Sequence, residues 1–296
     1  MDLDRLRSFV VLAEERHFGR AAERLRIAQP ALSRQLQVLE REAGTPLVLR
    51  STRSFELTEA GDLLVERARQ LLDAVGRTEQ DLRLLAQGRM GTSSVGFVGT
   101  ATYDLLPRVA RLAHTELPGL DLHVHGELLA PALVQGLLDR TYDVAVTRPV
   151  DPGRGVRTTL LRRERLVAVL PTHHRLAGRQ RLTLPELAEE TFVMHPSARA
   201  SSLTEVVLAA CSDAGFTPPG VVEVSETSTL VVSVAAGLGV AVVPQPVRTL
   251  SLEGVRYVSL RGAPTIDLCV AVRADDARPA TRRVVELIGR SVAQRR

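Results

Sequence analysis

The chain contains 296 residues, of which 45% are hydrophobic and 24% charged, and its formal net charge is +4. A chain of this length suggests two or three domains, and this composition allows each of them to bury an ordinary hydrophobic core. No apolar run approaches the roughly 18–20 residues that span a bilayer, so we expect no membrane-spanning segment.

Residues 1–57 predict three helices followed by a small β-hairpin. Apolar residues repeat at helical spacing over residues 3–13. A second helix begins near Gly19 and carries two adjacent alanines, which allow close approach of another helix. A third helix opens at Gln29-Pro30, where proline is tolerated, and ends at Gly44. Residues 50–57 then predict a short two-stranded wing.

A long helix is predicted from the N-cap Thr58 to about Gly88. Its apolar residues follow alternating steps of four and three, which is a heptad-like seam. Packing on its own domain would cover this seam. Because the flanking segments already have cores, we favour pairing with a second copy of the chain. Residues 87–94 are rich in glycine and serine and predict a hinge. The seam residues are Leu64, Ala68, Leu71, Val75, Thr78, Leu82 and Leu85.

From Val95 onward, strands alternate with helices. This alternation predicts a parallel sheet with helices on both faces. A second unit of the same kind begins with the strand at 165–170, and a final helix is expected over 280–293. The two cysteines, Cys211 and Cys269, lie far apart, which favours reduced structural thiols over a redox sensor.

The order of several short segments resembles LysR-type transcriptional regulators, and the resemblance covers nearly the whole chain. It implies a winged helix-turn-helix DNA-binding domain (1–58), a dimerising linker helix with hinge (59–91) and an effector-binding domain (92–296). The last is implied to be a two-lobed α/β domain of periplasmic-binding-protein type. Lobe I spans about 92–162 and 274–296, and lobe II about 163–273. The segments are Ala21-Ala22, Ala28 to Gln35, Leu57 to Gly61, Gly96 to Thr100, Leu105 to Pro107, Tyr142 to Val146 and Gly237 to Pro244.

The resemblance implies a cytoplasmic homo-oligomer, a dimer or a tetramer, that binds an interrupted palindrome in promoter DNA. It also implies a small-molecule effector and contact with RNA polymerase. The segments 96–100 and 147–148 look most like the subgroup that controls breakdown of aromatic compounds. The N-terminal residues 1–7 contain no apolar leader, which agrees with a cytoplasmic protein.

DNA reading requires hydrogen-bonding side chains at the start of a recognition helix. Residues 1–60 contain ten arginines against nine acidic residues. Only the placement of the arginines therefore supports DNA binding. Arg34 is our candidate for a bidentate contact to guanine, and Pro30 for a thymine methyl. A solvated polar face is the alternative, but the ordered set favours DNA. The candidates are Gln29, Pro30, Ser33, Arg34 and Gln37 on the helix, with Arg50 and Arg53 on the wing.

Two positions depart from the family pattern. Gly19 stands where serine or threonine usually caps the second helix, and glycine is a poorer cap. Leu47-Val48 replaces the usual Leu-Phe, which predicts less aromatic packing beneath the wing. We expect both departures to affect stability more than DNA contact.

Hydroxyl groups at helix starts, together with an arginine at the end of a strand, predict an anionic effector, with a carboxylate as the natural choice. Each serine or threonine alone is equally well explained as an ordinary N-cap. Ala130 stands where the closest subgroup often has threonine, so the effector is expected to differ from that subgroup's usual ligands. The candidates are Thr100, Thr102, Arg148, Ser201, Ser202, Leu203 and Thr227.

Other classes of protein have weaker support. His123 and His125 alternate on a predicted strand without a carboxylate at metal-binding spacing, so we expect no metal and no cofactor. The pair Gly237 and Gly239 lacks a third glycine and precedes a strand, so it is no dinucleotide motif. A hydrolase or metalloenzyme has no supporting motif. The alternative is a solute-binding module whose N-terminal DNA-binding domain (residues 1–58, called the head) is vestigial. The DNA-contacting candidates are nevertheless all present.

Overall fold

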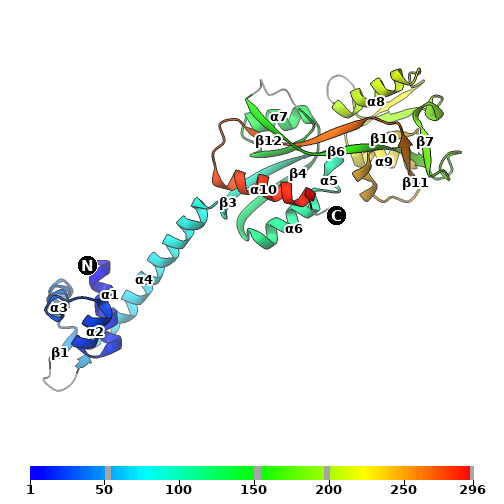
Figure 1. Ribbon diagram of the computed structural model, residues 1–296. Helices are drawn as coiled ribbons and strands as arrows, with labels where there is room; N and C mark the ends of the chain where they lie inside the picture. Colours follow the sequence, from blue (N-terminus) through cyan, green and yellow to red (C-terminus); the bar gives the residue numbers. More distant parts are fainter. Residues whose placement is uncertain (51–54, 150–154, 197–200, 294–296) are drawn as a thin grey trace. The chain divides into compact units, whose positions relative to one another are not determined.

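The computed structural model describes residues 1–50, 55–149, 155–196 and 201–293 (Figure 1). The chain divides into two compact units, Met1–Arg83 and Leu84–Arg296. Each unit has its own hydrophobic core, and the two are described separately below.

The first unit is a winged helix-turn-helix, as the sequence predicts. The two wing strands pair antiparallel, with Leu49 opposite Glu56. Leu32, Leu36 and Leu39 of the third helix are buried against the first two helices. The elements are α1 (Leu3–Glu15), α2 (Phe18–Leu25), α3 (Gln29–Ala43), β1 (Val48–Arg50), β2 (Phe55–Leu57) and α4 (Glu59–Ala86).

The start of α2 differs from the sequence prediction. The N-cap is His17 instead of Gly19, and its Nδ1 accepts a hydrogen bond from the backbone N–H of Arg20 at 3.2 Å. A side-chain acceptor satisfies one of the orphan N–H groups of the first turn, as serine or threonine does elsewhere. The prediction that glycine caps this helix was therefore wrong.

The wing is tied to α3 by a carboxylate. Glu40 Oε1 accepts hydrogen bonds from the backbone N–H groups of Leu47 at 3.0 Å and Val48 at 3.4 Å. Aromatic packing under the wing comes from Phe55, whose ring meets that of Phe18 edge-on with centroids 6.1 Å apart. Aromatic contact beneath the wing is thus supplied by neighbours of the Leu47-Val48 pair.

The long helix α4 begins at the predicted cap. Thr58 Oγ1 accepts from the N–H of Gly61 at 3.0 Å and donates to the carbonyl of Pro46 at 2.8 Å. A Cβ at Gly61 would lie 2.1 Å from the carbonyl oxygen of Leu47, so the helix approaches the wing at a distance only glycine permits. Farther along, Leu82 of the predicted seam is 61% exposed.

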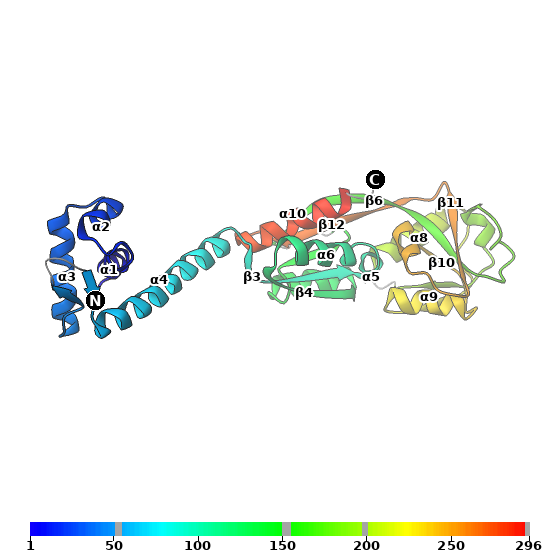
Figure 2. The ribbon, with the colours of Figure 1, turned by 90° about the horizontal axis from the view of Figure 1, so that it is seen from below.

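The second unit contains two lobes that share one sheet (Figures 1 and 2). Lobe I contains β3 (Met90–Val98), α5 (Gly99–Thr102), α6 (Leu106–Glu116), β4 (Gly119–Leu128), α7 (Ala130–Leu138), β5 (Val144–Thr147) and α10 (Pro279–Ala293). Lobe II contains β7 (Arg181–Thr183), η2 (Leu184–Leu187), β8 (Phe192–Met194), α8 (Ser202–Asp213), β9 (Val221–Glu223), α9 (Thr227–Ala235), β10 (Ala241–Pro244), η3 (Gln245–Thr249) and β11 (Val255–Arg261). The strands β6 (Val156–Pro171) and β12 (Thr265–Arg273) connect them.

The strand order is β4-β3-β5-β12-β6-β11-β7, with β10 also paired to β6. The pairs β3–β4 and β3–β5 are parallel, as predicted, but β12 runs antiparallel to β5 and β6. The sheet is therefore mixed, because β12 returns from lobe II into lobe I. The predicted hinge is also shorter: Met90–Ser94 pairs with β4 and belongs to the sheet.

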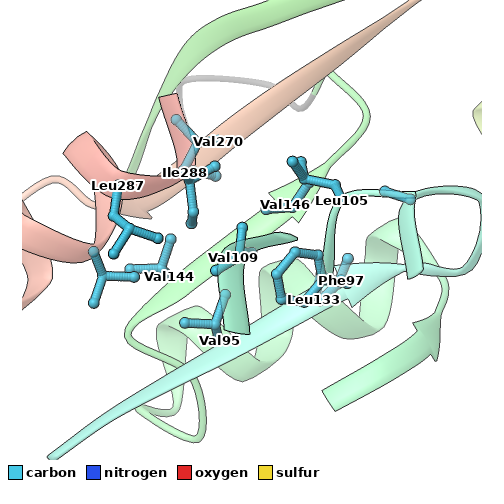
Figure 3. Close-up of a cluster of buried hydrophobic side chains, with 14 of the residues drawn as sticks. Val95, Phe97, Leu105, Val109, Leu133, Val144, Val146, Val270, Leu287 and Ile288 are labelled. Carbon is cyan, nitrogen blue, oxygen red and sulfur yellow. The ribbon is translucent and has the colours of Figure 1, made fainter. Parts of the chain in front are cut away.

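Separate cores hold the two lobes together internally. In lobe I, the side chains of Val95 and Phe97 on β3 pack against Val109 of α6 and Leu133 of α7 (Figure 3). Leu287 and Ile288 of α10 complete this cluster. Lobe II has two smaller clusters, built around Phe192 and around Val231. Within the described parts of the chain, no helix is both long and apolar enough to cross a membrane.

Candidate functional site

The candidate DNA-contacting residues of α3 share one accessible face. Gln29, Pro30, Arg34 and Gln37 are exposed, and Ser33 is half-buried. The helix begins at Gln29 with proline in its first turn and has no side-chain cap at Ala28. Pro30 has no N–H, and the N–H groups of Ala31 and Leu32 donate to the Ala28 carbonyl. The start of the helix therefore offers its polar side chains to a partner, and not a set of free backbone donors.

Arg34 differs from the arginines of α2. Arg20 lies 3.5 Å from Glu15, and Arg24 lies 3.0 Å from both Glu14 and Glu15. Among the described residues, no carboxylate pairs with Arg34. Its guanidinium is thus available to a partner outside the chain. Of the two wing candidates, Arg50 ends β1.

Arg53 is a predicted contact that falls outside the described residues. The structure therefore places five helix candidates together on α3, places the backbone of one wing candidate, and says nothing of the other.

Several effector candidates meet at a small cavity in the second unit. Thr100 contributes from α5, Arg148 follows β5, and Ser201, Ser202 and Leu203 open α8. The cavity measures about 20 Å³. Small-molecule pockets are usually on the order of 300–1,000 Å³, so this cavity, as the described residues form it, holds no more than one or two waters; residues 197–200, which precede Ser201, fall outside the described residues.

Arg148 anchors a buried charge network next to this cavity. Its side chain is 2% exposed and pairs with Glu164 at 2.8 Å. Its Nη1 also donates to the carbonyl of Asp267 at 3.1 Å, and its Nη2 donates to the hydroxyl of Thr100. The other oxygen of Glu164 lies 2.7 Å from Arg162, which in turn lies 2.7 Å from Asp104.

One donor of Arg148 is left over. Within the described residues, its Nε is buried without a hydrogen-bond partner. A buried unpaired N–H is costly and often marks a place where a ligand or an ordered water binds. The side chain that the sequence suggested for an anion is therefore largely neutralised by Glu164, with one donor remaining.

Thr102 and Thr227, the other two effector candidates, do not line the cavity. The hydroxyl of Thr102 accepts from the backbone N–H of Glu127 at 3.0 Å and serves the chain itself. Thr227 is fully buried, and its backbone N–H donates to Glu127 Oε2 at 2.9 Å. The first turn of α9 is therefore already occupied by a carboxylate from lobe I.

His195 lines the cavity and was not a sequence candidate. Burial lowers the pKa of His195, although a hydrogen bond to the Val224 carbonyl and the nearby Glu127 oppose this shift. The carbonyl lies 3.1 Å from Nδ1, so the neutral ring donates through Nδ1 and leaves Nε2 as an acceptor. Thr227 Oγ1 lies 3.4 Å from that Nε2.

Sequence reasoning also missed Glu127 and Glu164. Each acts on a residue distant in the chain, Glu164 on Arg148 and Glu127 on Thr227. No local motif marks such partners, because only the folded sheet brings them together. A single acidic residue near the end of a predicted strand was the only signal present.

The histidines and cysteines that the sequence analysis considered form no metal or redox site among the described residues. His123 lies 3.0 Å from Asp121 on the exposed part of β4. Among the residues that the structure describes, no cluster of three or more histidine, cysteine or acidic side chains could hold a metal ion. Cys211 and Cys269 are buried free thiols, and burial raises the pKa of Cys211 to about 11.

Comparison with known proteins identifies the same two units. A family model described as the LysR substrate binding domain matches residues 86–293, and one described as a bacterial regulatory helix-turn-helix protein of the lysR family matches residues 3–62. The probable cat1 operon transcriptional activator of Acinetobacter lwoffii is 35% identical over 280 residues, covering 94% of this chain and 91% of that protein. The HTH-type transcriptional regulator CatR of Pseudomonas putida is 34% identical over 289 residues, covering 97% of this chain and 98% of that protein.

Solved structures agree. CbnR, a LysR family transcriptional regulator, is similar with a TM-score of 0.87 and 27% identity, over 97% of this chain and 100% of that chain. Full-length CbnR in complex with its target DNA has a TM-score of 0.83 at 27% identity, over 99% of this chain and 100% of that chain. The resemblance predicted from the sequence is thereby confirmed. This chain belongs to the LysR family of DNA-binding transcriptional regulators, and it is not an enzyme.

Proposed function

We propose that the protein binds an interrupted palindrome in promoter DNA as a homo-oligomer and changes that binding when a small carboxylate occupies the cleft between lobes I and II. The observation that carries the proposal is the exposed polar face of α3, where Arg34 has no carboxylate partner among the described residues. It is supported by the match of the chain to a regulator in complex with DNA.

On DNA, Arg34 and Gln29 read base edges in the major groove, together with Ser33 and Gln37. Pro30 packs against a thymine methyl. Arg50 contacts phosphate, and Arg53 contacts the minor groove or the backbone. Two heads on one palindrome double this interface, and the protein's two-fold symmetry matches that of the site.

Oligomerisation proceeds through α4. Leu71, Leu82 and Leu85 are 51%, 61% and 45% exposed, although the spacing places them on one seam. Pairing with α4 of a second copy buries this seam and requires no other part of the chain to cover it. The resulting dimer, or a tetramer built from it, presents paired heads to DNA and recruits RNA polymerase in the cytoplasm.

The effector binds by opening this cavity. At about 20 Å³ among the described residues, the cavity admits no organic carboxylate, so its lining must rearrange when an effector binds. The start of α8 at Ser201 to Leu203, Thr100 and the free Nε of Arg148 then offer donors to an anion. The subgroup resemblance suggests an aromatic-derived carboxylate. An effector that favours the open arrangement shifts the population toward it.

We assign the roles by region: residues 1–58 bind DNA, 59–91 form the linker helix and hinge, and 92–296 bind the effector. Within the last, lobe I comprises about 92–162 and 274–296, and lobe II about 163–273. The strand β6 supports such a division, because Val156 packs in the core of lobe I and Leu166 in a core of lobe II.

Footprinting tests the proposal. The purified protein is placed on the DNA immediately upstream of its own gene across a salt series, because phosphate contacts make affinity fall with salt. Protection of an interrupted palindrome supports a regulator, and the adjoining operon then suggests carboxylates to add. Loss of protection at every salt concentration, with bulk DNA also unbound, would leave a ligand-binding module with a silent head. Unchanged affinity and footprint with every candidate carboxylate would reject the effector mechanism.

A further inference from the structure

Glu127 lies at the end of β4 in lobe I and reaches lobe II; the role proposed for it below rests on the effector cleft of the proposed function. Its two carboxylate oxygens accept from the first turn of α9: Oε2 from the N–H of Thr227 at 2.9 Å and Oε1 from the N–H of Ser228 at 3.0 Å. The hydroxyl of Tyr103 donates to Oε1 as well. A helix start with unpaired N–H groups is a general anion-binding position.

The backbone is shaped to place this carboxylate. Gly96 pairs with His125 and Val98 pairs with Leu128, so two residues of β4 oppose one of β3. This bulge lies at Glu127, whose φ of 55° falls in the left-handed region that non-glycine residues avoid. Bulges re-aim side chains beside functional sites. Conformations of this kind persist only where the surrounding contacts fix them.

Gly99, next to the carboxylate of Glu127, has no side chain, and this leaves room for the carboxylate. A Cβ on Gly99, the first residue of α5, would lie 2.6 Å from Glu127 Oε2 and 2.6 Å from Thr227 Oγ1. The strand end, the start of α5 and the start of α9 thus converge on one carboxylate group. Burial and the hydrogen bond to Glu127 raise the pKa of Tyr103, so the phenol stays a donor.

We propose that Glu127 is an internal ligand that determines effector specificity: its carboxylate fills the anion position at the start of α9, so the effector docks its own anionic group at the start of α8 and carries no second one toward α9. An effector with a carboxylate at the α9 end meets both an occupied hydrogen-bonding position and a like charge. The contact also joins the two lobes.

Chemical rescue tests this assignment on the full-length protein. Glu127→Ala removes the carboxylate and leaves the N–H groups of Thr227 and Ser228 open to a small anion. We expect about 100 mM sodium acetate to raise the Tm of this variant by about 2–4 °C over equal sodium chloride, because ligand binding to the native state stabilises it. Acetamide, which has the same size and no charge, should not do so.

The controls are the wild type and Glu226→Ala. Glu226 is an exposed carboxylate beside the same helix start, and it contacts Thr229 within lobe II. Acetate should leave the Tm of both proteins unchanged relative to chloride. An equal acetate shift in the wild type, or no shift in a folded Glu127→Ala protein, would overturn the proposal.

If Glu127→Ala does not fold, Glu127→Gln replaces it. Glutamine has the size of glutamate but no charge, so it holds the two backbone N–H groups less strongly. Hydrogen exchange at the backbone N–H groups of Thr227 and Ser228 should therefore be about tenfold faster than in Glu226→Ala. Unchanged exchange would overturn the proposal. Acetate rescue needs neither DNA nor the natural effector, so failure of the wild type to bind DNA would count against the proposed function alone.

Discussion

The α3 face and the effector cleft use polar side chains in opposite ways. On α3, Gln29, Arg34 and Gln37 are exposed, and no described carboxylate neutralises the arginine. In the cleft, Arg148 and Glu164 are 2% and 3% exposed and pair with each other. On the first surface, the guanidinium of Arg34 has no carboxylate partner among the described residues, as the proposed contact with DNA requires. In the cleft, the charged groups pair with one another.

The difference follows from the partners. DNA is fully solvated and highly charged, so free arginines gain affinity without any burial in the unbound protein. A buried guanidinium without a partner would be strongly destabilising, so the cleft must supply its own counter-charges. Removing one charge should therefore affect stability in the cleft and only binding on α3.

The largest effect is expected from Glu164→Gln, which leaves Arg148 and Arg162 without their shared carboxylate. Breaking a buried pair in this way costs about 3–5 kcal/mol. Urea unfolding of the full-length protein, followed by hydrogen exchange in residues 84–293, measures the loss. The matched control is Glu253→Gln, at an exposed position, which should change stability by no more than about 0.5 kcal/mol. An equal loss of unfolding free energy in the two variants would contradict the view that the ion pairs of Glu164 are buried from water.

A second prediction tests whether the stability of the winged helix-turn-helix depends on the close approach of α4 to the segment before the wing. Gly61→Ala places a Cβ 2.1 Å from the carbonyl oxygen of Leu47 and should destabilise the head by about 3 kcal/mol, the upper end of the usual cost of overpacking. Gly76→Ala on the same helix has nothing within 4 Å and should stabilise it by up to about 1 kcal/mol. The unfolding midpoints of the two variants should move in opposite directions. A shift in the same direction would contradict the close approach.

Arg34→Ala tests the α3 face, where removal of a charge should affect binding and leave stability unchanged. It should weaken operator binding by about 1–3 kcal/mol, that is, roughly 5- to 150-fold, and relax sequence preference, with stability unchanged. Fluorescence anisotropy on operator and on bulk DNA separates the two effects. Arg41→Ala, an exposed arginine in the last turn of α3, serves as control. A loss of the same size from Arg41→Ala, or tight operator binding by Arg34→Ala, would remove the assignment of Arg34 as the base-reading residue.

The smallest effect concerns Cys211. Burial raises the pKa of this thiol from 9.0 to about 11, so the folded protein holds a proton that the unfolded chain releases. Stability contributed by this group is present below pH 9 and is lost between about pH 9 and 11. The unfolding free energy of the wild type should fall more steeply over that interval than that of Cys211→Ala. Parallel slopes would show that the thiol titrates normally.

The contrast between the two surfaces also explains what the sequence could predict. The α3 face lies within one helix, so the spacing of Leu32, Leu36 and Leu39 was enough to place Arg34 on the opposite side. The elements of the second unit were predicted from local alternation in the same way, including β3 and α8. Thr100, Arg148 and Ser201 were placed at helix or strand ends by the same reasoning and lie around one cavity.

Long-range pairings could not be predicted. Glu127 meets Thr227 across 100 positions of the chain, and the antiparallel direction of β12 depends on its return from lobe II. Thr102 and Thr227 stay predictions as effector contacts, although the Thr102 hydroxyl and the Thr227 backbone N–H already bond to Glu127. His17 replaced Gly19 as a helix cap because the ring of a histidine can accept a hydrogen bond, a possibility that the residue pattern alone did not indicate.

The strand β6 has a mechanical consequence. Its residues 156–165 pair with β12, while 166–171 pair with β10 and β11. One uninterrupted strand thus belongs to both lobes. If β6 unpairs from the sheet in one lobe, the pairing in the other lobe is disturbed as well. Lobe movement must therefore be absorbed as twist in the paired strands β6 and β12, and the two lobes should melt in a single cooperative transition.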